Sequence, residues 1–480
     1  MSNKEQDETT MERVEIREVE GFGSAVVARA DLVPESVGME VFREEALIIS
    51  PPHNPALSPP WGRSRRELPE RCWQDYLHFL EQPDDVQEKV LSFYADMECG
   101  DALRVREFVK SYIETPKSAE LFTRLCMVIK FNTVAIQPVS EDGSGPGRDY
   151  GHGLFEVACR MAHSCRPNCV WFSFSQDHRF KNVRAIASIK AGEMLTINYL
   201  GPKTLEKPML LRRAELKRVK NFDCNCERCV RAALPGDDSR SFRCHNKRCN
   251  GYHLVKQVKE DDDPVLVGCN VCSEAPPAKY TEQMLDNEEK TRSAINYVDR
   301  VADYGLPVDV TRSIQLLKPP CERHGVAIQI YQAQSELYEQ QGRLAQAILV
   351  QRKLINCRLR IHGEEYLDEQ TGFQYERLGH LLVDDGDWPG AQKVYQRAVQ
   401  ALQIARGGSD EPYSQCAINK LISVQKRLLV VSPPTVSSAK CGLCGVSASK
   451  KCSRCLIPVY CSKDHQSCHW KVHKKLCNTS

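Results

Sequence analysis

Residues 158–169, ACRMAHSCRPNC, hold three cysteines, one histidine and one proline. Such a cluster points either to a metal site or to a Cys–His nucleophile pair. A nucleophile pair needs a third group that orients its base, and the residues around Cys165 show no recognisable nucleophile turn. A second cluster, FDCNCERC at 222–229, supplies Cys224, Cys226 and Cys229. Three cysteines at this spacing require a fourth ligand, and Cys165 can provide it across the fold.

The composition describes a soluble, multidomain protein. The chain has 480 residues, 41% of them hydrophobic and 27% charged, with a net charge of +2. This length exceeds what one core normally supports. The near-neutral charge argues against direct nucleic-acid binding, and the absence of a long apolar run argues against membrane insertion. The N-terminal segment MSNKEQDETT carries no apolar signal region, so we expect a protein of the cytoplasm or nucleus.

Cysteine usage in that compartment favours metal binding. The chain contains 23 cysteines, and seven of them lie in the last forty residues. Structural disulfides are rare in a reducing environment, whereas clustered thiols there are typical zinc ligands. We therefore expect zinc modules at a few defined places.

Hydrophobic periodicity and breaker residues divide the chain into segments. Short β-like runs such as SAVVARA and ALIIS occupy 11–60, helical spacing follows from 66 to 130, and short strands return at 131–200. The predicted organisation is a disordered tail at 1–10, a β-rich domain at 11–201 with a helical insertion at about 62–130, a cysteine region at 202–280, a helical repeat domain at 281–430, a linker at 431–440 and a zinc module at 441–480. The predicted fold class is α+β.

The helical segment repeats. GRLAQAILVQRKLINCRLRIHGEEY begins at Gly342 and GDWPGAQKVYQRAVQALQIARGGSDEP begins at Gly386. The period is 44 residues, the spacing from Gly342 to Gly386 and from Gly363 to Gly407. Helix pairs with glycine at the turns resemble a tetratricopeptide-type array, and an ordinary helical bundle is the alternative.

The last forty residues form the strongest motif. Each C-x2-C pair places two thiolates on one tight turn, where both can reach a metal about 2.3 Å away. The spacing C-x2-C, C-x2-C, Y-C, Q-x3-W-x2-H-x3-C resembles a MYND zinc finger. That resemblance implies two interleaved zinc sites, one formed by Cys441, Cys444, Cys461 and His465 and the other by Cys452, Cys455, His473 and Cys477. The family usually has cysteine at the position of His465, and Cys468 is the rival ligand.

Four further motifs occur in the order of a SET domain with its post-SET cysteines: GFG (21–23), HSCRPN (163–168), AGEMLTINY (191–199) and FDCNCERC (222–229). With the MYND-like module, the chain resembles the SET-and-MYND family of protein lysine methyltransferases. It departs in order, because the MYND finger stands at the C-terminus instead of inside the SET domain.

The resemblance implies S-adenosylmethionine as cofactor, a protein lysine as substrate, and a knot-like crossing near 163–168 and 193–199. Tyr199 would be the catalytic tyrosine, and cofactor contacts would come from Gly21, Gly23, Asn132, His163, Tyr199 and Phe222. Zinc would be held by Cys165, Cys224, Cys226 and Cys229.

Two departures favour an alternative, a catalytically silent adaptor acting in protein–protein interactions, for example in transcriptional regulation. Ala162 replaces the family's usual asparagine, and Lys220 stands where related enzymes place an aromatic residue. In either case we expect a monomer that binds a peptide or protein partner through the MYND finger and helical domain.

A further quartet is built like a zinc-ribbon pairing. Cys244 and Cys249 form one pair, and Cys269 and Cys272 the other, with a long acidic loop between them. The alternative is a post-SET extension with free cysteines. The expected zinc content is therefore three to four ions per chain.

Overall fold

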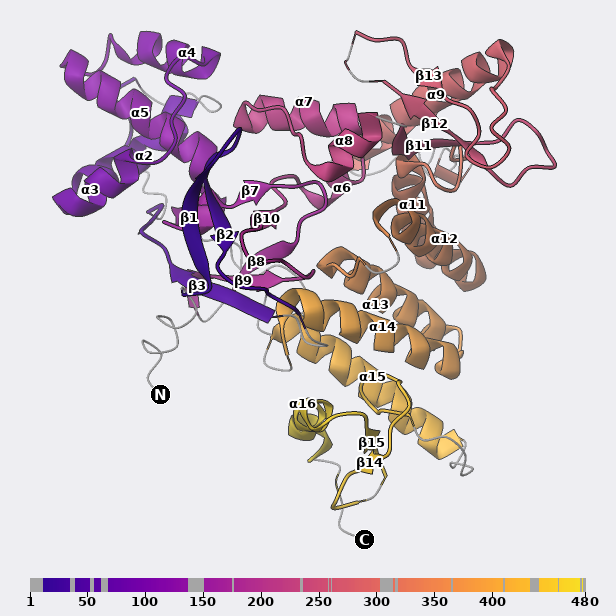
Figure 1. Ribbon diagram of the computed structural model, residues 1–480. Coiled ribbons are helices and arrows are strands. Elements are labelled where there is room, and N and C mark those ends of the chain that lie inside the picture. Colours follow the sequence, from indigo (N-terminus) through magenta and orange to yellow (C-terminus); the bar gives the residue numbers. More distant parts are fainter. Residues whose placement is uncertain are drawn as a thin grey trace.

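A computed structural model describes most of the chain (Figure 1). The described residues are 12–34, 39–51, 56–61, 68–136, 151–174, 177–233, 236–257, 259, 261–302, 314–315, 318–363, 366–408, 411–431, 440–455, 457–474 and 477. The predicted tail at 1–10 lies outside them, as does most of the predicted linker at 431–440.

Short strands build the N-terminal part around one apolar core. β2 shows why: its first two residues are exposed, and Ala25 to Ala28 are all buried. The strands pair in the orders β1-β2, β3-β9-β8, β4-β6-β5 and β10-β7. Their bounds are β1 Val14–Val19, β2 Gly23–Ala28, β3 Met39–Glu45, β4 Ile48–Ile49, β5 Val134–Ala135, β6 His152–Leu154, β7 Ala162–His163, β8 Cys169–Phe174, β9 Asp177–Ala185 and β10 Thr196–Ile197.

A bundle of helices interrupts these strands and lies beside β1 and β2 at one end of the molecule (Figure 1). It consists of α2 Leu68–Leu80, α3 Asp84–Leu91, α4 Gly100–Val109 and α5 Pro116–Asn132. Thr115 caps α5 by accepting a hydrogen bond from the Ser118 N–H, and Pro116 occupies the first turn. Buried Phe79 and Phe122 belong to the bundle's own core.

The end of α5 corrects one prediction. Short strands were predicted to return from residue 131, but the helix continues through Asn132 and the strand β5 begins at Val134. The reason is packing, because buried Phe131 completes the apolar face of α5 against the bundle core.

A short helix, η1 Ala158–Arg160, lies between β6 and β7. After the strands come helices and a small sheet: α6 Pro202–Leu205, α7 Met209–Lys220, α8 Glu227–Ala233, β11 Asp237–Arg243, β12 Tyr252–Lys256, β13 Val265–Leu266 and α9 Ala278–Ala302. The strands pair antiparallel in the order β11-β12-β13. The long α9 runs beside this sheet (Figure 1).

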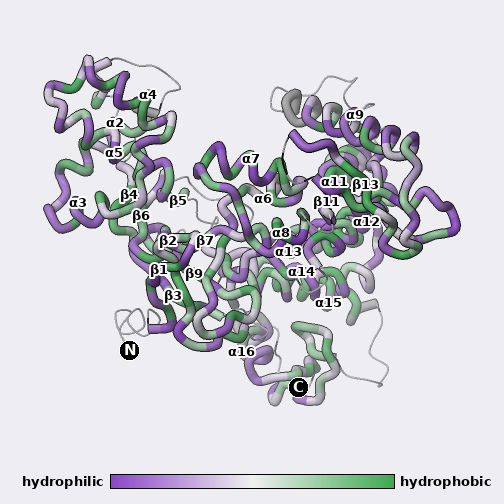
Figure 2. Tube along the Cα trace, turned by 45° about the horizontal axis from the view of Figure 1, so that its top comes forward, coloured by the Kyte–Doolittle hydropathy of each residue, from purple (hydrophilic) through white to green (hydrophobic). Residues whose placement is uncertain are grey.

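An array of antiparallel helices follows: α11 Gly325–Gln340, α12 Leu344–His362, α13 Glu369–Asp384, α14 Trp388–Arg406 and α15 Pro412–Val431. Hydrophobic and hydrophilic residues alternate along these helices (Figure 2), as amphipathic packing requires. The four glycines that mark the period all have positive φ, so the repeat in sequence is a repeat in backbone geometry; they are Gly342, Gly363, Gly386 and Gly407. The tetratricopeptide assignment itself stays a prediction.

The C-terminal module consists of β14 Lys450–Lys451, β15 Val459–Tyr460 and α16 Lys463–His473. It lies against α15 (Figure 1), and buried Leu443 and Tyr460 belong to the same apolar cluster as Leu421 of α15. The Gln425 side chain donates a hydrogen bond to the carbonyl of Gly442, at 2.8 Å. The module is therefore docked on the helical array.

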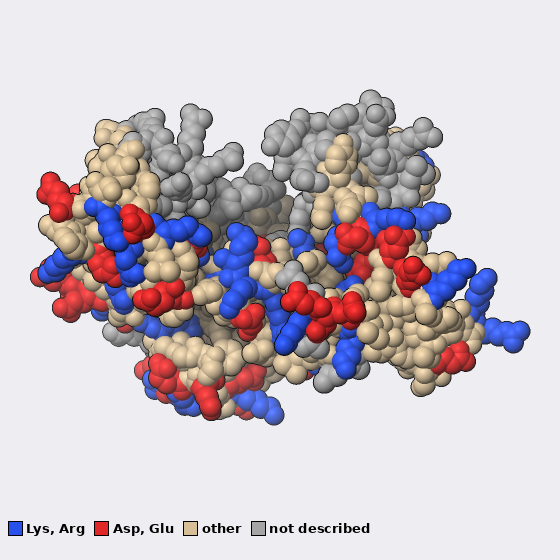
Figure 3. All heavy atoms as spheres, turned by 90° about the horizontal axis from the view of Figure 1, so that it is seen from above, with Lys and Arg blue, Asp and Glu red and all other residues tan. Residues whose placement is uncertain are grey.

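None of the described helices has the length and apolarity that a membrane span requires. On the face shown in Figure 3, acidic and basic side chains are intermixed, in keeping with the net charge of +2.

Candidate functional site

Two distant segments lie side by side at the centre of the site. β7 pairs in parallel with β10, with Ala162 opposite Thr196 and His163 opposite Ile197. Asn168 fixes this pairing, because its side chain accepts from the Thr196 N–H at 2.8 Å and donates to the Met194 carbonyl at 2.9 Å. The motifs HSCRPN and AGEMLTINY therefore meet, as the resemblance implies.

The structure also brings together Cys165, Cys224, Cys226 and Cys229, whose sulfurs all lie within 4.8 Å of one another. Cys165 Sγ and Cys229 Sγ are 3.7 Å apart. A tetrahedral zinc site with Zn–S bonds of about 2.3 Å has sulfurs about 3.8 Å apart, so the donor set fits zinc. Buried Arg212 of α7 approaches Cys229 Sγ to 3.7 Å and stabilises the negative charge of thiolates there.

His163 joins this cysteine group to Tyr199. Its Nδ1 accepts a hydrogen bond from the Tyr199 N–H at 3.0 Å, so the ring proton of the neutral imidazole lies on Nε2. Nε2 lies 3.4 Å from Cys165 Sγ and can donate to it. Burial lowers the pKa of His163 to about 4, which keeps the ring neutral. Both ring nitrogens are therefore used within the protein.

Tyr199 lies in an aromatic group. Its ring centroid is 5.3 Å from that of His163 and 6.3 Å from that of Phe222. The Tyr199 hydroxyl donates a hydrogen bond of 2.5 Å to the carbonyl of Met161. Burial raises the pKa of the Tyr199 phenol, so this residue is a neutral hydroxyl with its oxygen lone pairs available.

Lys220, the last residue of α7, reaches into the same group. Its Nζ lies 5.5 Å from the centroid of the Tyr199 ring and donates to the carbonyl of Phe131 at 2.8 Å. No carboxylate pairs with Lys220 among the described residues. Burial lowers its pKa. The family's aromatic position is thus taken by a cation that faces Tyr199.

The remaining predicted cofactor residues are placed as follows. Gly21 and Gly23 form the exposed turn between β1 and β2 with φ of +77° and +69°, and a Cβ at either would meet nothing within 4 Å. Glycine suits that backbone conformation, and the free space leaves room for a ligand. Phe222 is half-buried beside His163. These features fit S-adenosylmethionine. The Asn132 amide is engaged elsewhere, donating to the carbonyls of Tyr94 and Val128.

The two predicted C-terminal ligand sets also assemble. Cys441, Cys444, Cys461 and His465 form one group, and Cys452, Cys455, His473 and Cys477 form the other. Sulfur pairs lie 3.5 Å apart for Cys444 and Cys461, and 3.8 Å apart for Cys452 and Cys477. His465 Nδ1 lies 3.1 Å from Cys461 Sγ. The rival ligand Cys468 belongs to neither group among the described residues; it is partly buried against the apolar cluster that the finger shares with the helical array.

A fourth set, Cys244, Cys249, Cys269 and Cys272, is brought together in the same way. The four sulfurs are thus close enough to share one metal ion, and the choice between a zinc site and a post-SET extension with free cysteines stays a prediction.

Comparison with known proteins agrees with this geometry. The family model for the SET domain matches residues 23–200, and that for the MYND finger matches residues 441–477. The chain is a SET-and-MYND domain protein. The predicted α+β class is confirmed, and so is the position of the MYND finger after the SET domain.

Several named relatives share parts of the chain. The histone-lysine N-methyltransferase ASHR1 of Arabidopsis thaliana is 23% identical over 314 residues, which are 60% of this chain and 61% of that protein. The histone-lysine N-methyltransferase SMYD3 of Mus musculus is 30% identical over 168 residues, 31% of this chain and 36% of that protein. The SET domain-containing protein SmydA-8 of Drosophila melanogaster is 30% identical over 148 residues, covering 29% and 31%. The chain therefore matches less than two thirds of each relative's length.

Arg212 and Arg228 were not predicted from the sequence as site residues, but both donate hydrogen bonds to the group formed by Cys165, Cys224, Cys226 and Cys229. Arg228 donates to the carbonyls of Cys165 and Leu205, at 3.1 and 2.8 Å. Two local features of the sequence could have pointed to them. Arg228 lies inside the CERC motif, and Arg212 lies one helical turn from Leu216 on the buried side of α7.

Proposed function

We propose that the chain is an S-adenosylmethionine-dependent protein lysine N-methyltransferase acting on histone or non-histone protein. The SET domain and relatives named as histone-lysine methyltransferases support this reaction class. The observation that carries the proposal is the connection from Cys165 through His163 to Tyr199, which ties the cysteine group to the aromatic site.

The chain's own residues would have simple tasks in this reaction. Gly21, Gly23 and Phe222 would hold the cofactor, and His163, whose two ring nitrogens are used within the protein, would line the same pocket. Asn132 would contribute only if its amide left its present carbonyl partners. The bound cofactor would supply an electrophilic methyl group. Tyr199 contributes a neutral hydroxyl, which is held in place by its hydrogen bond to the Met161 carbonyl. The lone pairs of this hydroxyl oxygen would orient an incoming amine.

The substrate lysine must lose its proton before it can attack. An exposed lysine has a pKa near 10.4, and an apolar, aromatic environment disfavours its charged form. The rings of Tyr199, Phe222 and His163 provide such surroundings. The site would therefore favour the neutral amine, and its remaining contribution would be to position that amine for attack on the methyl group.

Ala162 supports the proposal through its backbone. It lies in β7 opposite Thr196, so the pairing of β7 with β10 is kept although the side-chain amide of the family's usual asparagine is missing.

Lys220 favours the second candidate function, an adaptor without catalysis. Its ammonium group faces the ring of Tyr199, where a substrate ammonium or another cation would have to approach. Like charges at this range oppose binding. The MYND finger and helical array would then supply the function by docking a peptide or protein partner.

The deciding experiment combines cofactor binding with transfer. Calorimetry of the purified full chain with S-adenosylmethionine is followed by transfer of radiolabelled methyl groups to a cell lysate. We expect binding and transfer by the wild type, and loss of transfer in Tyr199→Phe with an unchanged zinc content. Absence of cofactor binding would refute the enzyme. Binding without transfer would support the adaptor.

We also propose that the protein acts as a monomer in the cytoplasm or nucleus.

A further inference from the structure

Residues 244–272 hold a cysteine quartet outside the regions matched by the SET and MYND models. Cys244 and Cys249 follow β11, and Cys269 and Cys272 follow β13. Cys244 Sγ lies 3.7 Å from Cys272 Sγ, and Cys249 Sγ lies 3.6 Å from Cys269 Sγ. These distances are close to the edge of a tetrahedral zinc–thiolate site, about 3.8 Å, and are far from the S–S bond of about 2 Å in a disulfide.

The backbone around the quartet is arranged to support thiolates. The Gly251 N–H donates to Cys249 Sγ at 3.3 Å, and the Val271 N–H donates to Cys269 Sγ at 3.5 Å. Hydrogen bonds of this kind stabilise negative charge on sulfur. A Cβ at Gly251 would collide with Cys269 Sγ, so the chain is closed tightly around the four sulfurs.

The small sheet has little else to hold it together. Its own buried apolar cluster consists of Phe242, Val255 and Leu266 alone, with partly buried side chains of α9 packed against it. A core of this size does not normally sustain an independent fold, and a structural metal is a common remedy.

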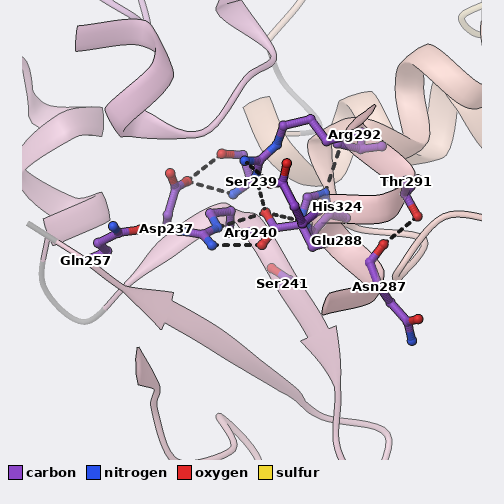
Figure 4. A network of polar contacts seen from close by, with 12 residues as sticks. Asp237, Ser239, Arg240, Ser241, Gln257, Asn287, Glu288, Thr291, Arg292 and His324 are labelled. Atoms are coloured by element: carbon purple, nitrogen blue, oxygen red, sulfur yellow. Dashed lines mark hydrogen bonds and ion pairs between the residues drawn. The ribbon is translucent and has the colours of Figure 1, made fainter. Parts of the chain in front are cut away.

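The sheet is in turn joined to the helical array through a buried ion network (Figure 4). Arg240 of β11 donates to both carboxylate oxygens of Glu288 in α9, at 2.9 and 2.7 Å. Glu288 also lies 3.1 Å from His324 Nε2 and accepts from Arg292 at 2.7 Å. His324 caps α11 by accepting from the Val326 N–H, and it is fully buried.

We propose that Cys244, Cys249, Cys269 and Cys272 bind a fourth zinc ion, whose role is to fix β11 so that Arg240 can hold α9 and α11. The metal thus attaches the small sheet to α9 and to the helical array. Because a buried charge needs partners in fixed places, loosening β11 would deprive Glu288 of the two hydrogen bonds from Arg240.

Zinc content of the full chain tests the metal site, independently of any methyl transfer. We expect four zinc ions per wild-type chain, one for each ligand quartet. The double variant Cys249→Ser/Cys269→Ser should hold three. Cys416→Ser, which alters a cysteine of α15 outside every quartet, should keep four. Three ions in the wild type, or four in the double variant, would overturn the proposal.

Hydrogen exchange tests the coupling. In the double variant, amides of β11 and of the first turn of α11 should exchange at least about tenfold faster, because the ion network loses its anchor. Glu288→Gln should produce faster exchange in α11 while zinc remains at four. Unchanged exchange in α11 of the double variant would refute the coupling role.

Discussion

Replacing Lys220 tests how the site treats positive charge. Lys220 Nζ lies 5.5 Å from the centre of the Tyr199 ring. We take a separation of about 5.5 Å between Nζ and a second cation bound beside that ring. At an effective dielectric constant of about 20, two unit charges about 5.5 Å apart repel each other by about 3 kcal/mol. That energy corresponds to roughly a hundredfold in a binding constant.

Lys220→Met keeps much of the side-chain volume and removes the charge. Titration calorimetry should compare S-adenosylmethionine, which is a cation at sulfur, with its demethylated product, which is neutral there. We expect the variant to improve the affinity for the cation relative to the neutral compound by up to roughly a hundredfold. Lys217→Met, which removes an exposed lysine of the same helix, serves as the control.

The pH dependence has a definite sign. Burial lowers the pKa of Lys220, so raising the pH neutralises it before exposed lysines. Discrimination against the cation should therefore fade with rising pH in the wild type and stay constant in the variant. An identical affinity ratio in wild type and Lys220→Met would show that Lys220 does not control the site.

Three further outcomes are expected. Cys165→Ser should lower the zinc content by one ion and weaken cofactor binding, and elemental analysis with unchanged zinc would contradict the ligand assignment. Glu288→Ala should destabilise the chain in urea by about 3–5 kcal/mol, because it leaves buried cations unpaired. Burial opposes ionisation of Glu288, but its hydrogen bonds, from His324 first, hold its pKa below the ordinary value. The stabilisation that ionised Glu288 contributes is therefore present above the unfolded pKa of about 4.3 and is lost as the pH falls. The wild type should lose more stability on acidification than Glu288→Ala. Parallel curves of unfolding free energy against pH for the two proteins would refute this. Gly379→Ala should cost about 1–3 kcal/mol, because its Cβ would lie 2.6 Å from the Tyr395 ring. Gly342→Ala, with positive φ and open space, should cost only about 1 kcal/mol, and the reverse order in thermal unfolding would be inconsistent with this packing.

Local spacing was enough to predict much of this molecule. The pairs Cys441/Cys444 and Cys452/Cys455 each predict metal binding from four consecutive residues, since a tight turn alone brings two sulfurs to one metal. The glycines of the helical array likewise mark turns that only a few residues can form.

Other features depend on contacts that no local pattern encodes. Asn132 was expected at a strand, but burial of Phe131 in the helical bundle extends α5 through it. Arg240, Glu288 and His324 come from three separate elements, and each looks like an ordinary surface residue until the fold buries it. The resemblance marks Lys220 as an unusual residue, but only the structure gives the direction of its side chain, toward the carbonyl of Phe131.

The docking of the MYND finger on α15 has a consequence for whatever the finger holds. Tyr460 and Leu443 share one apolar cluster with Leu421, and the Gln425 side chain donates a hydrogen bond to the Gly442 carbonyl, so the finger is packed directly on α15. A protein bound by the finger would therefore be held in one orientation and at one distance relative to the helical array. Choice among cargoes would then depend on their shape as much as on the short motif they display.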